Sequence, residues 1–391
     1  MRTPWVSVLI PCRDQGRFLN EALASVFAQE GAAMEAIVVN DGSRDETASI
    51  IERWCRRLPG RVKGIEGGGE GQALARRRAA REARGEYWIT LDADDGLLPN
   101  MVAQGLEALA RAPMAVAAVG DVLMTDADGR RVSEILRQRG LGDWPAVLES
   151  CPIGAWNGVL LRAEMVRAVG GIGVDGPPGA EDWDLAVRLV RAGMSVAPIR
   201  RAVAWYRQHP GSHSRTPLPP LLARLAMLER CRAPDSRLEG IGREQPILTD
   251  KAYQVLRNRM IFFALGVAAV VKAEEAMTVL SFLIAGPRQE ACWAAAYAEG
   301  FAHALRGGFD RPGVVPPEVR EAVVAVFRQR WGWEVKETGA FILRMARAVR
   351  WRLFPGPRHF WRRLQVGCAT RLLERSRAEI QRKRMNREVA S

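Results

Sequence analysis

Three carboxylates follow directly after a strand-like run in the middle of the N-terminal half. The run Tyr87 to Leu91 leads at once into Asp92, Asp94 and Asp95. In open α/β sheets, ligands bind beyond the carboxyl ends of the strands. An Asp-x-Asp pair at such a place can present hard oxygen ligands to a divalent cation that holds phosphate groups. The alternative is a simple turn in which Asp95 serves the next helix, and the triplet alone does not decide between the two.

The same Asp-Ala-Asp spacing recurs at Asp126 and Asp128, which shows that spacing by itself proves little. This second pair lies between two short strand-like runs and is followed by Gly129, so we expect a hairpin tip there. Position at the end of a buried strand therefore distinguishes the first pair as a candidate metal site.

Asp41 stands at the end of another predicted strand, in the segment "NDGS". A carboxylate there could accept a hydrogen bond from a nucleobase or a ribose hydroxyl, because the sheet rule places it in the same crevice. The competing interpretation is a turn and helix cap, for which Asp-Gly-Ser is well suited.

Two further candidates lie later in the chain. Glu181 and Asp182 begin an amphipathic helix after a loop rich in glycine and proline, where a carboxylate could act as a general base or could only complement the helix dipole. His209 lies close to Arg207 in a polar segment suited to phosphate or metal contacts.

The elements that must position these residues alternate between strand and helix, which predicts a parallel α/β sheet. A Ser43 and Glu46 capping box is expected before the second helix, and "TPLPPL" at 216–221 is expected to end this domain. The expected strands are 5–11, 35–43, 61–66 and 86–91, and the expected helices include those at 72–84, 99–112 and about 180–194.

Composition describes a folded protein, with 48% hydrophobic and 26% charged residues. The 6 cysteines form no close pair, which favours a reducing compartment over a zinc site or disulfide framework. No signal peptide is evident at the N-terminus. The longest apolar run, 260–271, is shorter than the roughly 20 residues that span a bilayer, so we expect a cytoplasmic protein.

Positive charge is concentrated at the C-terminus. Residues 340–391 contain 14 Arg or Lys and 3 Glu, a surplus of 11 within a total net charge of +13. Aromatic and leucine residues are interspersed there, as in basic helices that lie on anionic membranes. A solvated tail, or a helix packed on the protein's own acidic surface, is the alternative interpretation.

Five segments in this order resemble family 2 of the nucleotide-sugar glycosyltransferases, which have the GT-A fold. The resemblance spans roughly residues 5–215 and leaves 220–391 uncovered. The segments are "VSVLIPCRDQGRFLNEALASVFAQ", "VVNDGSRDET", "GEYWITLDADD", "GAEDWDLAVRLVRAG" and "WYRQHPGSHS".

The resemblance implies roles for individual residues. On the donor side the implied residues are Pro11 and Arg13 along the nucleotide, Asp41 at the base, commonly uracil, Asp92 at the ribose and Arg76 at a phosphate or ribose. At the centre they are Asp94 binding Mg²⁺ or Mn²⁺, His209 near the metal and diphosphate, and Asp182 with Glu181 deprotonating the acceptor hydroxyl. Trp156 and Asn157 are candidates for the acceptor side.

The chain departs from the family pattern at two places. Asn40 stands where the family often has Asp, which leaves Asp41 intact. The stretch Ala75 to Ala79 lacks the Asn and Gly that usually follow the arginine before the fourth strand, so nucleotide specificity in this region is open.

The resulting expectation is a GT-A nucleotide-sugar-binding domain with a mostly parallel sheet, followed by an α-helical C-terminal region. We expect a catalytic domain at 1–215, a helical domain at 216–335 and a basic amphipathic helical tail at 336–391. The implied reaction is metal-dependent, inverting sugar transfer from a nucleotide sugar, commonly a UDP-sugar, to a glycan or lipid-linked acceptor in bacterial cell-surface polysaccharide synthesis.

The expected location is the cytoplasm, with the segment 340–391 on the inner face of the plasma membrane. Two other function classes stay open. The basic tail could bind nucleic acid, although no recognisable nucleic-acid motif is present and no nucleic-acid partner is expected. The domain could also be a catalytically silent sugar-nucleotide sensor, against which the intact Asp94 and Asp182 argue.

Overall fold

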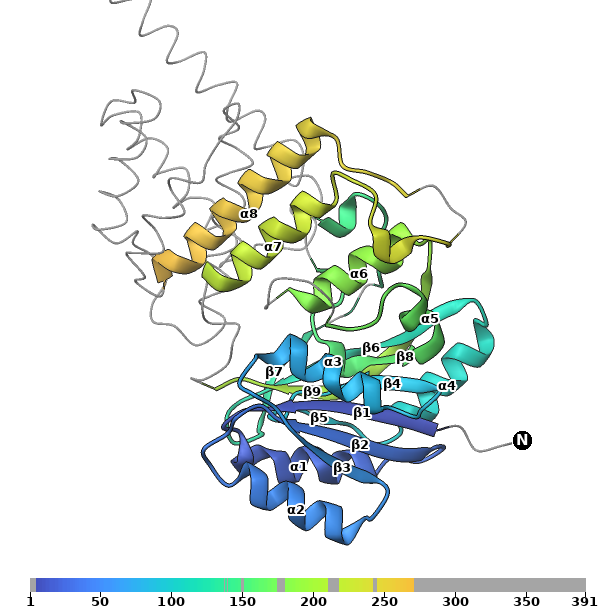
Figure 1. The fold of residues 1–391 in the computed structure, drawn as a ribbon, viewed down its shortest axis with the longest axis vertical. Helices are drawn as coiled ribbons and strands as arrows, with labels where there is room; N and C mark the ends of the chain where they lie inside the picture. The colour runs from blue at the N-terminus through green and yellow to red at the C-terminus, as the bar shows by residue number, and fades with distance from the viewer. Residues whose placement is uncertain are drawn as a thin grey trace, which may run out of the picture. The chain divides into compact units, whose positions relative to one another are not determined.

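Figure 1 shows the fold of the protein in a computed structural model. The structure describes residues 5–136, 138, 140–148, 151–173, 180–209, 218–241 and 245–270. The predicted tail at 336–391 and most of the predicted helical domain at 216–335 lie outside the described residues. Residues up to 213, together with 222–253, group into one compact unit, and every residue of the candidate site belongs to it.

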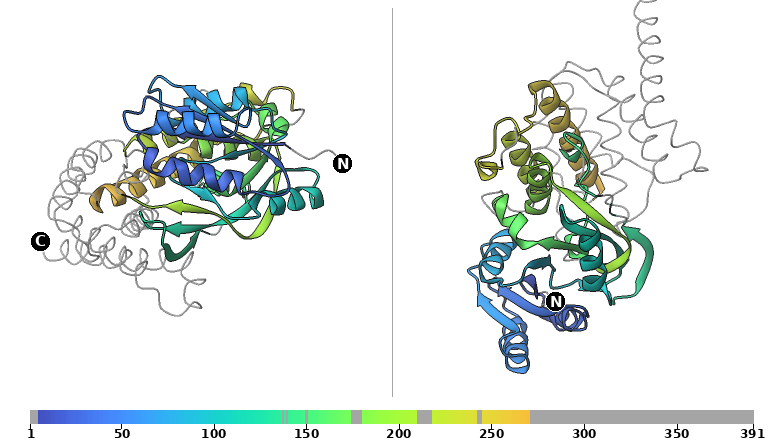
Figure 2. Two further views of the ribbon diagram at one scale, coloured as in Figure 1. Left: turned by 90° about the horizontal axis from the view of Figure 1, so that it is seen from below. Right: turned by 90° about the vertical axis from the view of Figure 1, so that its right-hand side faces the viewer.

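The first part of this unit alternates between strand and helix as the sequence predicts. The elements are β1 (Trp5–Cys12), α1 (Gly16–Phe27), β2 (Ala33–Asn40), α2 (Thr47–Arg57), β3 (Val62–Glu66), α3 (Gln72–Glu82) and β4 (Tyr87–Thr90). In Figure 1, α1 and α2 lie on one side of the sheet and α3 on the other. The left view of Figure 2 shows α1 and α2 side by side.

The second part has shorter strands and more irregular connections. Its elements are β5 (Gly96–Leu97), α4 (Met101–Arg111), β6 (Ala115–Thr125), β7 (Arg131–Leu136), β8 (Val159–Arg162), α5 (Ala163–Ala168), α6 (Glu181–Arg191) and β9 (Ser195–Arg207), with 3₁₀ turns η1 (Ala146–Leu148) and η2 (Trp156–Gly158). The helices α7 (Leu218–Arg230) and α8 (Asp250–Val270) follow, with η4 (Ser236–Leu238) between them. Within the described residues, no helix has the length and apolarity needed to cross a membrane.

All of these strands join one sheet in the order β3-β2-β1-β4-β8-β6-β9-β5, with β7 paired to β6. The strands β1 to β4 are parallel, and β6 is parallel to β9. The pairs β4–β8, β5–β9, β6–β7 and β6–β8 are antiparallel. The predicted α/β class is confirmed. The parallel arrangement holds for the first four strands, and the sheet is mixed beyond them.

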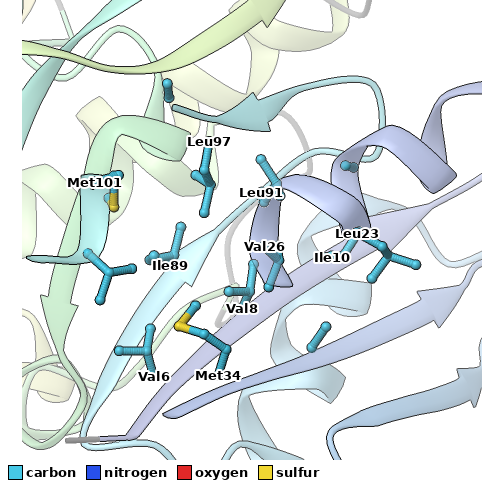
Figure 3. Close-up of a cluster of buried hydrophobic side chains, with 14 of the residues drawn as sticks. Val6, Val8, Ile10, Leu23, Val26, Met34, Ile89, Leu91, Leu97 and Met101 are labelled. Carbon is cyan, nitrogen blue, oxygen red and sulfur yellow. The ribbon is translucent and has the colours of Figure 1, made fainter. Parts of the chain in front are cut away.

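The core lies between the sheet and the helices α1 and α4. Alternate residues of β1 point into it, namely Val6, Val8 and Ile10, and they are fully buried. Figure 3 shows these side chains gathered with Leu23 and Val26 of α1. Burial of such side chains stabilises the fold by roughly 1.5 to 3 kcal/mol each. This packing fixes the positions of β1 and β4, and hence of the residues that follow their carboxyl ends.

Two local predictions differ from the structure. The capping box of Ser43 and Glu46 is wrong, because α2 begins at Thr47 and its first turn is held by Asp45, whose Oδ1 accepts from the Thr47 amide at 3.0 Å. The strand β9 was not predicted. Its last residues, 205–207, belong to the segment 205–215 that we expected to be a polar loop. The hairpin at Asp126 and Asp128 is confirmed by the antiparallel pairing of β6 and β7.

Gly96 is required by a close approach of two strands, which gives a test of the fold. It pairs with Trp205 across β5 and β9, and a Cβ at Gly96 would overlap the indole ring. We expect Gly96→Ala to lower the free energy of unfolding by about 1 to 3 kcal/mol, as overpacking does elsewhere, in urea denaturation followed by circular dichroism. Gly68→Ala is the control, since its Cβ would meet nothing closer than 3.6 Å. Equal stability of the two variants would contradict this packing.

Candidate active site

The parallel strands β1 to β4 deliver the predicted donor-site residues to one edge of the sheet. Cys12 pairs with Asn40, and Asn40 pairs with Glu66, so these strands end level with one another. The amide of Leu91 donates to the carbonyl of Leu9 at 3.0 Å, which continues the register past β4. Arg13, Asp41 and Asp92 therefore follow neighbouring strand ends, where ligands bind in such sheets. Pro11 is buried within β1, and Arg13 is exposed.

Asp41 is buried and organises the glycine-rich loop between β3 and α3. Its Oδ1 accepts from the amide of Glu70 at 3.0 Å and its Oδ2 from the amide of Gly71 at 2.8 Å. A Cβ at Gly67 would lie 2.9 Å from the Asp41 Oδ1, so only glycine lets the loop approach this closely. Asp41 thus fixes the shape of this loop. Its carboxylate oxygens retain further acceptor sites, which a ligand such as the predicted base could use.

Asp92 is joined to the catalytic-helix candidate Glu181 through one buried arginine. Arg76 of α3 donates to Asp92 Oδ1 at 2.5 Å and to Glu181 Oε1 at 2.7 Å. Gln72 also donates to Asp92 Oδ1, at 2.7 Å. Burial lowers the pKa of Arg76, whereas the charges of Asp92, Glu181 and Asp182 raise it, and the net shift is upward. The guanidinium therefore stays charged. It lies between two acids, Asp92 and Glu181, that are 89 residues apart in sequence.

Asp94 is paired with His209, the residue that the resemblance predicts near the metal. The two side chains meet at 2.8 Å between Asp94 Oδ2 and His209 Nε2. Gln15, at the start of α1, donates to the same Oδ2 at 3.2 Å. The imidazole of His209 also lies 5.2 Å from the ring of Phe18, centre to centre. Among the described residues, no hydrogen bond to Asp94 Oδ1 is formed, so this oxygen can still bind a ligand.

Asp95 has a supporting position. Its Oδ1 accepts from the Arg207 amide at 2.9 Å, and its Oδ2 accepts from Asn157 Nδ2 at 3.2 Å. The Arg207 guanidinium in turn donates to the carbonyl of Asp94 at 2.9 Å. These bonds tie the acidic segment to β9 and η2, and both carboxylate oxygens are engaged with the protein.

The carboxylates of Asp92, Asp94 and Asp95 lie together, with one oxygen of each within 4.8 Å of the others. Burial and then the Asp92 charge raise the pKa of Asp94, and the His209 contact opposes this. Burial, followed by Asp94 and Asp92, raises the pKa of Asp95 well above its usual value. Clustered carboxylate oxygens of this kind suit Mg²⁺ or Mn²⁺, so the residues present fit a divalent cation.

Asp182 lies in the first turn of α6, next to the Arg76 bridge. The amide of Trp183 donates to Asp182 Oδ1 at 2.7 Å and fixes the carboxylate. Burial and then Glu181 raise the pKa of Asp182, while Arg76 lowers it. A carboxylate with a raised pKa is a stronger base once it is ionised.

Both acceptor-side candidates, Trp156 and Asn157, are buried. Asn157 is buried, and besides Asp95 it donates to the carbonyl of Trp205 at 2.8 Å, so it supports the acidic segment. Trp156 is buried beside it in η2. Gln15 and Gln72 were missed, because a glutamine at the start of a helix carries no distinctive sequence signal.

The N-terminal part of the chain is similar to known proteins. Residues 7–169 match the family described as Glycosyl transferase family 2. The chain is 30% identical over 201 residues to the O-antigen biosynthesis protein RfbC of Myxococcus xanthus, which is 51% of this chain and 15% of that protein. It is 32% identical over 96 residues to the uncharacterized glycosyltransferase YibD of Escherichia coli K12, which is 25% of this chain and 28% of that protein. The chain thus spans less than a third of the length of either curated relative.

Among solved structures, S. aureus TarS residues 1–349 in complex with UDP-GlcNAc is similar, with 14% identity and a TM-score of 0.49. The match covers 89% of this chain and 91% of that one.

The crowded carboxylates make stability depend on pH in a defined direction. The folded-state pKa of Asp94 is raised above its ordinary value of 3.8. The folded protein therefore loses stability as pH rises from 3.8 towards the raised pKa, because the unfolded chain ionises first. The cost is absent below 3.8 and constant above the raised pKa. Asp94→Asn removes the charge and keeps an oxygen for His209. We expect the variant to gain stability relative to the wild type as pH rises, by about 1.4 kcal/mol for each unit of pKa elevation.

Urea denaturation in metal-free buffer between pH 4 and pH 8 measures this difference. A difference between variant and wild type that stays constant or shrinks with rising pH would contradict the proposed repulsion.

Proposed function

We propose that this chain transfers a sugar from a nucleotide-sugar donor to an acceptor hydroxyl, with inversion at the anomeric carbon. The match of residues 7–169 to glycosyl transferase family 2 supports this proposal. The observation that carries the proposal is the continuous series of contacts from Asp92 through Arg76 to Glu181. It joins the strand edge that would hold the donor to the helix that carries the candidate base, Asp182.

The donor side would be formed by the loops that follow β1, β2 and β4. Arg13, Asp41 and Asp92 stand there, and a UDP-sugar is the donor that the family resemblance favours. Asp94 would be the principal ligand of Mg²⁺ or Mn²⁺, with His209 beside it. When bound, the cation would neutralise charge on the nucleotide diphosphate as it leaves.

The candidate base would act on the opposite face of the sugar. The acceptor oxygen forms a bond to the anomeric carbon, the bond from that carbon to the diphosphate oxygen breaks, and the hydroxyl proton passes to Asp182. The Trp183 amide orients the Asp182 carboxylate. Arg76 holds Glu181 in an ion pair and would thereby position the helix that carries Asp182.

We also propose the class of acceptor and the cellular location. Similarity to a protein named for O-antigen biosynthesis supports a glycan or lipid-linked acceptor in bacterial cell-surface polysaccharide synthesis. A cytoplasmic enzyme that docks on the membrane through residues 340–391 would meet such acceptors. We also propose the domain limits 1–215, 216–335 and 336–391.

Asp94 tests the metal site. We expect Asp94→Ala to weaken Mn²⁺-dependent binding of UDP by at least about 10-fold, since a lost metal ligand or its support typically costs 10-fold to 100-fold in affinity. Isothermal titration calorimetry with UDP, with and without Mn²⁺, measures the effect. Asp128→Ala is the matched control, because Asp128 occupies the same Asp-Ala-Asp spacing in an exposed hairpin turn. Unchanged binding by Asp94→Ala would contradict the assignment.

Asp182 tests the base. We expect Asp182→Asn to lower kcat by at least about 100-fold, the usual contribution of general base catalysis, while Mn²⁺-dependent UDP binding is retained. Because the pKa of Asp182 is raised, wild-type activity should fall on the acid side at a pH above the ordinary Asp value. Nucleotide release from a panel of donors and acceptors measures both effects, and near-normal turnover by the variant would rule out this role.

A further inference from the structure

Arg224 of α7 carries a positive charge for which the described part of the chain provides no hydrogen bond and no ion pair. It lies beyond residues 7–169, the region that matches the family. Its guanidinium carbon stands 5.1 Å from the ring centre of Trp183, within the range of a cation–π contact. The indole of Trp183 is itself fixed, since its Nε1 donates to the carbonyl of Val147 at 2.7 Å. The guanidinium is therefore oriented by an aromatic face, and its N–H donors have no acceptor among the residues that the structure describes.

The surroundings of Arg224 are those of the proposed acceptor side. Its pKa is lowered by burial, against which Asp182 and then Cys151 act. Burial and then Asp182 raise the pKa of Cys151 well above its usual value, so the thiol is neutral and does not balance the charge. Cys151 also interacts with Trp156 of η2. Residues of α6, α7 and η2 thus meet around Cys151, next to the candidate base.

We propose that Arg224 binds an oxyanion, either phosphate or carboxylate, carried by the acceptor. The inference rests on the proposed function, which makes Asp182 the base, and it extends that function by assigning the acceptor a negative charge close to the hydroxyl that reacts. A half-buried guanidinium with unused donors matches an oxyanion in charge and in the planar geometry of its N–H groups. The stacking on Trp183 would hold that plane in place before the acceptor arrives.

A role limited to balancing the charge of Asp182 is the competing explanation. Such a role would call for an ion pair, yet Arg224 forms none with Asp182, whose Oδ1 accepts from the Trp183 amide instead. Arg76 supplies the larger of the two positive charges that lower the pKa of Asp182, and Arg224 supplies the smaller. Within the described part of the chain, the N–H groups of Arg224 therefore remain without an acceptor, and a ligand can take that place.

Direct binding of small anions tests the proposal without requiring turnover. Sodium phosphate and methyl glucuronide represent the two acceptor chemistries, and each is titrated calorimetrically into the metal-free chain of 391 residues at moderate salt. We expect saturable binding of at least one anion at about one site. Arg224→Gln should weaken it by at least 10-fold, and Arg224→Lys should weaken it less. Arg200→Gln, which removes an equal charge from an exposed position, should leave it unchanged.

Which anion binds identifies the source: phosphate indicates a phosphorylated or lipid-linked acceptor, and glucuronide indicates an acidic sugar. Absence of binding by the wild type, or equal binding by Arg224→Gln, would overturn the proposal. UDP binding with Mn²⁺, measured on the same samples, reports on the donor site separately. Failure of UDP binding would count against the proposed function, whereas failure of anion binding alone would count only against the role of Arg224.

Discussion

The acidic segment after β4 places three carboxylates close together in a largely buried position, and the rest of the site is arranged to hold them there. Each carboxylate takes its partner from a different part of the chain: Asp92 from α3, Asp94 from the segment after β9, and Asp95 from β9 and η2. Buried carboxylates without partners would be strongly destabilising. The cost of burying these charges therefore requires contacts from four elements that are distant in sequence. These contacts give the acidic segment a fixed shape before any ligand binds.

This arrangement divides the work among neighbouring acids. Asp95 has both oxygens bonded to the protein and acts as an anchor, whereas Asp94 keeps one oxygen for a ligand. Asp92 shares Arg76 with Glu181, so a movement of Asp92 on the donor side would also move the helix α6, which bears Asp182. The arginine that the sequence suggested as a nucleotide contact thus acts, in this structure, as a connection between two acids.

Much of this could be predicted from local patterns. The apolar runs of β1 to β4 located the strand ends, and the hairpin at Asp126 showed which Asp-Ala-Asp pair to set aside. The strand β9 escaped prediction because Pro198, Arg200 and Arg201 interrupt its apolar alternation, although its long pairing with β6 makes it a strand. Asn157 was assigned to the acceptor side from its sequence position alone, since its bond to Asp95 joins residues that are 62 positions apart and leaves no local signal.

The central claim is that the cluster around Asp94 holds a divalent cation together with a nucleotide diphosphate. The most direct measurement is a crystal structure of the chain with UDP and Mn²⁺, with diffraction data collected at the manganese absorption edge. The account predicts an anomalous peak coordinated by a carboxylate oxygen of Asp94 and by oxygens of the diphosphate. A manganese peak elsewhere, or UDP bound away from the ends of β1, β2 and β4, would contradict it.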